Sequence, residues 1–193
     1  MLKTAIVPGL KYIPNYLDRT QQEKLIQTID RQSWLTDLKR RVQHYGYKYD
    51  YKKRKVDYSM FLGKLPEWLD NLADRLYQNK IFKIKPDQAI INEYNPGQGI
   101  TSHIDCIPCF SDPIVSLSLN STCIMQFSRD KKEKIYLLLE PGSLTVMEKD
   151  ARYNWKHSIP PRKKDKYCDR EIVRTRRISI TFRKVIVDRI VSG

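Results

Sequence analysis

The chain has 193 residues, 40% of them hydrophobic and 10% aromatic, with only seven glycines. This length allows one compact domain with a sizeable core, and the composition is typical of a globular protein. No apolar run is long enough to span a bilayer, and the N-terminal residues lack the apolar core of a secretory signal. We therefore expect a soluble intracellular protein, in the cytoplasm or the nucleus.

The chain is strongly basic, with a net charge of +14 and an isoelectric point of about 9.6. Such an excess favours a polyanionic partner, with nucleic acid first and an anionic membrane surface second. A charge that only aids solubility is the simpler alternative, because charge alone identifies no ligand.

Two segments of the first half predict amphipathic helices. Leucine and isoleucine recur with helical spacing in residues 19–31 and again in residues 66–79. Pro66 stands at a plausible first helical position of the second segment. Two helices of this kind usually cover a sheet.

Residues 44–58, HYGYKYDYKKRKVDY, combine tyrosines with a run of basic residues. Aromatic rings among cations suit base stacking and phosphate contact. The alternative is a hairpin whose tyrosines pack on the core, and both interpretations can hold for different tyrosines. The candidate contacts to nucleic acid are Tyr45, Tyr47, Tyr49, Lys52, Lys53, Arg54 and Lys55.

From residue 88 onward the pattern changes to short strands separated by turn-like stretches. Many short strands favour a sandwich or a barrel, of which a jelly roll is one solution, and helices before strands make the fold α+β. The polar stretch 160–173 is expected to be a loop. The predicted strands cover residues 88–94, 114–119, 123–128, 135–140, 143–148 and 177–187.

The last predicted strand begins with RISITFR, which alternates an apolar face with a face that carries Arg177 and Arg183. In a jelly roll one face of this strand points into the lumen. Two buried guanidinium groups need anions there. A carboxylate suits the planar fork of arginine, because both can share two parallel hydrogen bonds.

His103 and Asp105 in TSHIDC point the same way if the segment is extended, and His157 lies far downstream. Two histidines and one carboxylate on one face of an iron ion form the non-haem Fe(II) oxygenase arrangement. The H-x-D triplet alone is a weak signal and leaves zinc hydrolysis open. Asn92 and Tyr94 share a strand face nearby, so all these groups fit one pocket for 2-oxoglutarate.

Cys106 and Cys109 form a C-x-x-C motif, but no second pair follows at zinc-finger spacing. In a reducing compartment we expect free thiols, with neither a disulfide nor a zinc site.

The stretch INEYNPGQGITSHID, the later His157 and RISITFR resemble the AlkB family of Fe(II)- and 2-oxoglutarate-dependent dioxygenases. The resemblance runs in order over residues 88–184 and extends more loosely upstream to RRVQHYGYKYDY. These phrases are most similar to the AlkB domain of the eukaryotic tRNA wobble-uridine hydroxylase.

The resemblance implies a double-stranded β-helix, a cupin-like jelly roll, with N-terminal helices packed on the sheet. It implies a single domain over residues 1–193, with helices and a nucleotide-recognition lid in 1–87 and the jelly-roll core in 88–187. The implied iron ligands are His103, Asp105 and His157. The implied contacts to 2-oxoglutarate are Asn92, Tyr94, Arg177, Ser179 and Arg183.

Within that set, the resemblance implies that Arg177 and Tyr94 meet the distal carboxylate and that Arg183 meets the end near iron. Ser179 stands where many members of the family have asparagine, and its shorter hydroxyl implies a weaker or water-mediated contact. Ile107 stands where the bacterial repair prototype has an acidic residue that favours a cationic methylated base. Asp112 is the candidate to approach from the adjoining loop.

The expected activity is that of a dioxygenase that uses Fe(II), 2-oxoglutarate and molecular oxygen on alkylated or modified nucleobases in DNA or RNA, including tRNA. Oxidative dealkylation repair is the preferred interpretation, and hydroxylation of a modified wobble uridine is the alternative. A dioxygenase for another substrate and a non-enzymatic nucleic-acid-binding domain also stay open. The base must leave its stack to reach the metal. We expect a monomer without membrane contact. A second basic loop follows His157 and contains Arg162, Lys163, Lys164 and Lys166.

Overall fold

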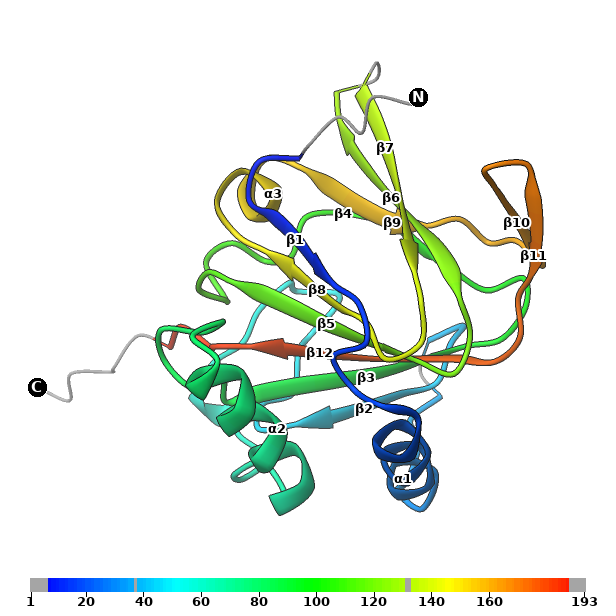
Figure 1. The fold of residues 1–193 in the computed structure, drawn as a ribbon. Coiled ribbons are helices and arrows are strands. Elements are labelled where there is room, and N and C mark those ends of the chain that lie inside the picture. Colours follow the sequence, from blue (N-terminus) through cyan, green and yellow to red (C-terminus); the bar gives the residue numbers. More distant parts are fainter. Residues whose placement is uncertain (1–6, 37, 131–132, 188–193) are drawn as a thin grey trace, which may run out of the picture.

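Two antiparallel sheets face each other in the computed structural model, which describes residues 7–36, 38–130 and 133–187 (Figure 1). The larger sheet has six strands in the order β1-β8-β5-β12-β3-β2, and the smaller sheet has four in the order β4-β9-β6-β7. A separate hairpin consists of β10 and β11. This arrangement confirms the predicted α+β jelly roll.

The strands are β1 (Leu10–Ile13), β2 (Val42–Tyr45), β3 (Gln88–Tyr94), β4 (Ile100–His103), β5 (Ile114–Leu119), β6 (Cys123–Arg129), β7 (Glu133–Leu139), β8 (Leu144–Met147), β9 (Lys156–Ile159), β10 (Lys164–Tyr167), β11 (Arg170–Val173) and β12 (Arg177–Arg183). The helices are α1 (Arg19–Asp30), α2 (Glu67–Gln78), α3 (Lys149–Tyr153) and a 3-10 turn (Tyr58–Met60).

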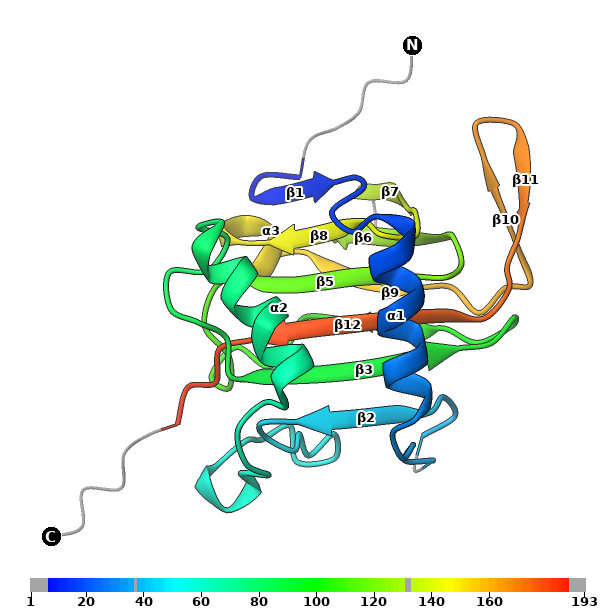
Figure 2. The ribbon, with the colours of Figure 1, turned by 60° about the horizontal axis from the view of Figure 1, so that its bottom comes forward.

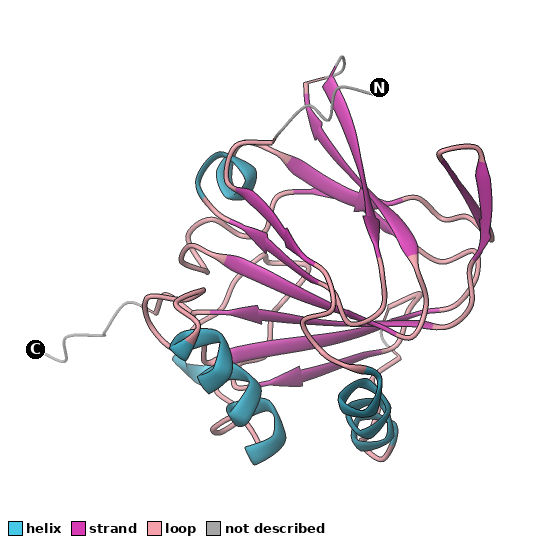
Figure 3. Cartoon of the chain, viewed as in Figure 1, coloured by secondary structure: helices cyan, strands magenta, loops and turns pink. Residues whose placement is uncertain are grey.

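Helices α1 and α2 lie across the outer face of the larger sheet, as predicted (Figure 2). Ile29 of α1 and Leu69 of α2 belong to one buried core with Ile178, Ile180 and Phe182 of β12. Figure 3 shows that both helices stay outside the space between the sheets. The apolar face of β12 therefore packs on the helices, and its polar face is left for the interior. None of the helices in the described residues is long and apolar enough to cross a membrane.

Six of the observed strands correspond to predicted ones, and the hydrophobic pattern of the sequence did not predict the others. β1 and β2 come from the N-terminal part, which was expected to hold only helices and a lid, and both join the larger sheet. β1, β2, β4 and β9 have four residues each, too few for alternation to stand out.

The expected loop at residues 160–173 is instead the β10–β11 hairpin, which is polar because it is mostly exposed. Asp165 is its buried anchor. Nε and Nη2 of Arg174 donate to its carboxylate at 2.5 and 2.7 Å, and the backbone N–H of Ile124 donates to it at 3.1 Å. The anchor leaves the basic side chains exposed: Arg162, Lys163, Lys164 and Lys166.

Asp18 caps helix α1. Its carboxylate accepts from the backbone N–H of Gln21 at 2.8 Å, and the Gln21 side chain accepts from the backbone N–H of Asp18 at 3.1 Å, which forms a capping box. We expect Asp18→Ala to lower the free energy of unfolding by about 1 kcal/mol in urea denaturation. Asp18→Asn keeps the acceptor and should lose much less. Equal losses in the two variants would contradict the capping role.

Candidate functional site

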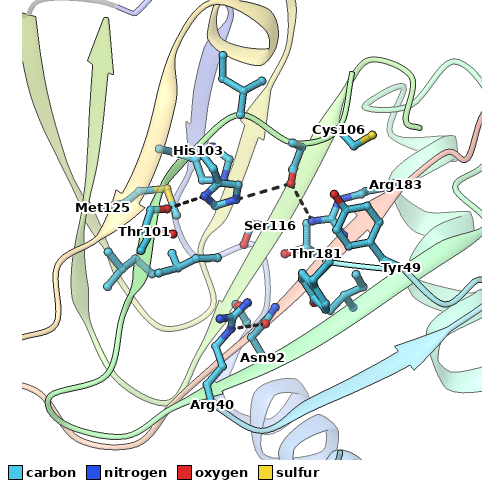
Figure 4. Close-up of a pocket in the computed structure, with 18 of the residues that line it drawn as sticks. Arg40, Tyr49, Asn92, Thr101, His103, Cys106, Ser116, Met125, Thr181 and Arg183 are labelled. Carbon is cyan, nitrogen blue, oxygen red and sulfur yellow. Dashed lines mark hydrogen bonds and ion pairs between the residues drawn. The ribbon is translucent and has the colours of Figure 1, made fainter. Parts of the chain in front are cut away.

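The polar face of β12 lines a cavity of about 360 Å³ between the two sheets. Four alternating residues of β12 line this cavity: Arg177, Ser179, Thr181 and Arg183. Both arginines of the strand therefore point into the interior, as predicted. Strands β3, β4 and β9 and the segment around Tyr49 supply further walls (Figure 4). The cavity therefore joins residues that are widely separated in the sequence.

His103, Asp105 and His157 meet at one side of the cavity. Strands β4 and β9 pair so that His103 lies opposite His157, and the ring centroids are 4.3 Å apart. Asp105 follows the end of β4, and one ligand atom from each of the three residues lies within 4.8 Å of the others. This spacing can hold one metal ion.

A backbone contact sets the tautomer of His103. Its Nδ1 lies 2.7 Å from the carbonyl oxygen of Thr101, which can only accept, so Nδ1 carries the proton (Figure 4). Nε2 keeps its lone pair and lies 3.8 Å from Oδ1 of Asp105. A histidine held this way presents a defined nitrogen to a metal.

The charge states of the other two residues also suit a metal. Burial lowers the pKa of His157 to about 3, so its imidazole is neutral. Burial acts to raise the pKa of Asp105, but the charges around it together outweigh burial, lower the pKa and keep the group ionised. Arg183 contributes most among them, with Nη2 3.1 Å from Oδ1 of Asp105. A neutral imidazole and a carboxylate are the forms that bind divalent cations. Oδ2 of Asp105 is buried and accepts no hydrogen bond in the described residues, which fits a cation there.

Arg152, which the sequence reasoning missed, holds the loop that carries Asp105. Its guanidinium donates to the backbone carbonyls of Asp105, Cys106 and Phe110 at 3.0, 3.2 and 3.0 Å. The residue belongs to the five-residue helix α3 and is buried. No motif surrounds it, so only the fold reveals its place.

Arg177 lies buried in another part of the cavity wall. Its Nη2 donates to Oγ of Ser118 at 2.9 Å, and its guanidinium carbon is 5.4 Å from the ring centroid of Tyr94. Nε and Nη1 of Arg177 have no partner in the described residues, and neither has Nε of Arg183. Buried donors without acceptors are costly, so a bound carboxylate fits here.

Asn92 and Tyr94 lie on β3, beside the arginine strand. The register of β3 and β12 places Arg177 opposite Tyr94 and Ser179 opposite Asn92. All four line the cavity. The structure thus brings together the predicted 2-oxoglutarate contacts, and it adds Arg40, whose Nε donates to Oδ1 of Asn92 at 2.8 Å.

The predicted tyrosines separate into two environments. Tyr45 packs edge-on against Trp68 on the helix side of the larger sheet, and Tyr47 is buried against Phe61, so neither lines the cavity. Tyr49 lines it, and so does Tyr51, which was not among the predicted contacts. Strand β2 ends at Tyr45 and the chain bends at Gly46, so the tyrosines that follow do not continue one strand face.

The basic run is a turn beside the cavity. Asp50 accepts from the backbone N–H groups of Lys52 and Lys53 at 2.9 Å each, and Lys55 pairs with Asp57 at 2.8 Å. Arg54 lines the cavity. The lysines are exposed at the rim, so of the four only Arg54 contributes to the wall.

Two expectations next to Asp105 are corrected. Cys106 and Cys109 form a disulfide, because the intervening turn brings their Cα atoms to 5.2 Å, whereas Cys123 and Cys168 are free. Free thiols were expected from a reducing compartment alone, because the geometry of this turn cannot be read from the sequence. Asp112 does not approach the cavity, since its Oδ2 accepts from the backbone N–H of Lys149 at 3.0 Å.

Comparison with known proteins agrees with this geometry. The sequence model of the 2OG-Fe(II) oxygenase superfamily matches residues 9–183. An uncharacterized protein of Acanthamoeba polyphaga mimivirus is 40% identical over 186 residues, which cover 94% of this chain and 87% of that protein. The solved structure of OsALKBH1 superposes with a TM-score of 0.70 at 16% identity, over 93% of this chain and 99% of that one, which shows the shared fold.

Two relatives have names that state a function. The alkylated DNA repair protein ALKBH8 homolog of Arabidopsis thaliana is 37% identical over 203 residues, which cover 93% of this chain and 59% of that protein. The tRNA (carboxymethyluridine(34)-5-O)-methyltransferase ALKBH8 of Mus musculus is 37% identical over 169 residues, 83% of this chain and 26% of that protein. The chain therefore spans only part of each. Fe(II), 2-oxoglutarate and molecular oxygen are the cofactor and cosubstrates of this enzyme, and the chain belongs to the 2OG-Fe(II) oxygenase superfamily as a member of the AlkB family.

Proposed function

We propose that the protein oxidises modified nucleobases in nucleic acid, with iron held by His103, Asp105 and His157. One observation carries the proposal: three convergent ligand atoms share a cavity with buried arginine donors that have no acceptor among the described residues. A metal and a dicarboxylate satisfy both sets of groups at once. When bound, the iron and 2-oxoglutarate supply oxygen-dependent oxidation of a C–H bond.

The residues of the chain bind and orient the reactants. Arg177 and Tyr94 bind the distal carboxylate of 2-oxoglutarate, and Arg183 binds the end near the metal while it helps to keep Asp105 ionised. Asn92 and Ser179 contact the cosubstrate between these ends. Tyr49, Tyr51 and Arg54 border the remaining space, where a flipped base enters.

The surface around the cavity supports a nucleic-acid substrate. Exposed cations lie on the turn that carries Lys52, Lys53 and Lys55 and on the β10–β11 hairpin, and the whole chain carries a charge of +14. The names of the relatives from Arabidopsis thaliana and Mus musculus refer to alkylated DNA repair and to tRNA. We propose a monomer of the cytoplasm or nucleus, which analytical ultracentrifugation and imaging of the tagged protein would test.

Oxidative dealkylation is the first candidate reaction, and hydroxylation of a modified uridine in tRNA is the second. The charge of the cavity favours the second candidate, because Asp105 is the one carboxylate among its described lining residues, against Arg40, Arg54, Arg177 and Arg183. No acid is left to pair with a cationic methylated base, whereas a neutral or anionic uridine derivative meets no such penalty.

The test is succinate formation from 2-oxoglutarate with Fe(II) and oxygen, in the presence of alkylated DNA or of tRNA. Nucleoside mass spectrometry before and after the reaction identifies the base that changes and separates the two candidates. Turnover stimulated by an extract free of nucleic acid, but by no nucleic acid, would contradict the proposed substrate class.

A stacking role for Tyr49 gives a further prediction. Tyr49→Ala should raise the KM for the nucleic-acid substrate about tenfold, because base–aromatic stacking contributes about 1–3 kcal/mol. Turnover of 2-oxoglutarate without substrate should not change. Tyr77→Ala is the matched control, since Tyr77 is exposed on α2 and does not line the cavity. Equal effects of the two substitutions on KM would argue against stacking at Tyr49.

A further inference from the structure

Arg40 contacts Asn92 in the cavity wall, although the two residues are 52 positions apart in the sequence (Figure 4). Nε of Arg40 donates to the Asn92 side chain at 2.8 Å. A guanidinium has donors only, so the atom that it meets is the carbonyl oxygen Oδ1. The contact therefore settles which way the Asn92 amide faces.

The opposite end of that amide is left for a ligand. With Oδ1 held by Arg40, the two N–H groups on Nδ2 are the free part of the side chain. No acceptor in the described part of the chain takes a hydrogen bond from Nδ2, and Asn92 lines the cavity. An amide turned the other way would present an acceptor, which repels a carboxylate.

We propose that Arg40 is a positioning residue for 2-oxoglutarate, because it turns the Asn92 amide so that its N–H groups donate to the bound cosubstrate. This inference rests on the proposed role of Asn92. Arg40 also lies 5.8 Å from the ring centroid of Tyr94, the residue that Arg177 faces at 5.4 Å. One side chain thus holds two members of the cosubstrate wall.

The neighbouring residues explain why Arg40 faces inward. Arg41 donates to Glu93 twice, from Nε at 2.6 Å and from Nη2 at 2.7 Å, and Glu93 also pairs with Arg176 at 2.6 Å. Within strand β3, consecutive residues point to opposite faces of the sheet, so Glu93 faces away from the cavity that Asn92 lines. Because positions 41 and 93 pair outside the cavity, positions 40 and 92 meet inside it.

Binding of 2-oxoglutarate to the Mn(II)-loaded full chain, measured by calorimetry without turnover, tests the inference. Binding of 2-oxoglutarate to the wild-type protein is measured first. Its absence would contradict the proposed function and not the role of Arg40 in particular. Arg40→Ala should weaken binding about tenfold, since a charge-assisted hydrogen bond then no longer orients the amide. Lys39→Ala is the matched control: it removes a neighbouring exposed charge, and its backbone carbonyl still accepts from Gln98.

A second variant separates orientation from simple charge. In an Asn92→Ala background, Arg40→Ala should have almost no further effect on binding, because the group that it orients is gone. Arg40→Lys should restore part of the affinity. The proposal is overturned if Arg40→Ala leaves binding unchanged, if Lys39→Ala weakens it equally, or if the losses from Arg40→Ala and Asn92→Ala simply add.

Discussion

His103→Ala should abolish tight metal binding and, with it, all conversion of 2-oxoglutarate to succinate. Loss of a partner that merely orients a ligand costs about 10–100-fold in metal affinity, so loss of a ligand itself should exceed about 100-fold. Anaerobic calorimetry with Fe(II) or Mn(II) measures the affinity, and succinate formation measures turnover. The expected loss follows from the place of His103, opposite His157 and beside Asp105.

The fold should survive this substitution. His103 is about one-third exposed, with a side-chain exposure of 30%, so its removal leaves no large buried void. The metal-free variant should therefore unfold at the wild-type temperature. Ser102→Ala, at the exposed position before it in β4, should keep both metal binding and turnover. Wild-type metal affinity in His103→Ala would remove this residue from the proposed ligand set.

Arg177→Ala should weaken 2-oxoglutarate binding by about 100- to 4,000-fold, because breaking a buried ion pair costs about 3–5 kcal/mol. Arg177→Lys should recover little of it, since an ammonium group cannot replace the bidentate fork. Calorimetry on the Mn(II)-loaded protein measures both. The free protein should lose little stability, because only Nη2 of Arg177 has a hydrogen-bond partner in the described residues, the hydroxyl of Ser118.

The preceding residue supplies the control. Arg176 lies on the other face of the chain and pairs with Glu93 at 2.6 Å and with Asp30 at 2.9 Å. Arg176→Ala should therefore lower the free energy of unfolding and leave 2-oxoglutarate affinity near the wild-type value. If Arg176→Ala weakened binding as much as Arg177→Ala does, the effect would come from general loss of charge and not from a carboxylate contact.

Patterns along single strands were enough for much of the site. Alternation in RISITFR placed Arg177 and Arg183 on the interior face of β12, because a strand repeats every two residues. The same two-residue period placed Asn92 and Tyr94 on one face of β3. The helices followed from apolar spacing that matches the observed core of α1 and α2.

Contacts between distant segments could not be read in this way. Arg40 meets Asn92 only because the chain before β2 lies beside β3, and Arg152 meets the Asp105 loop from a helix without any motif. Tyr45 and Tyr49 belong to one tyrosine-rich segment, yet the chain turns after β2 and places them on opposite sides of the larger sheet.

The amino-acid sequence by itself determined which chemistry this protein carries: the imidazoles, the carboxylate and the interior arginines, on strands whose period can be read locally. The tertiary structure alone decided how these groups meet, which tyrosines border the cavity, that Cys106 and Cys109 are close enough to bond, and which arginine orients Asn92. The physical reason is that local spacing sets the face on which a side chain lies, whereas pairing of distant strands sets its neighbours.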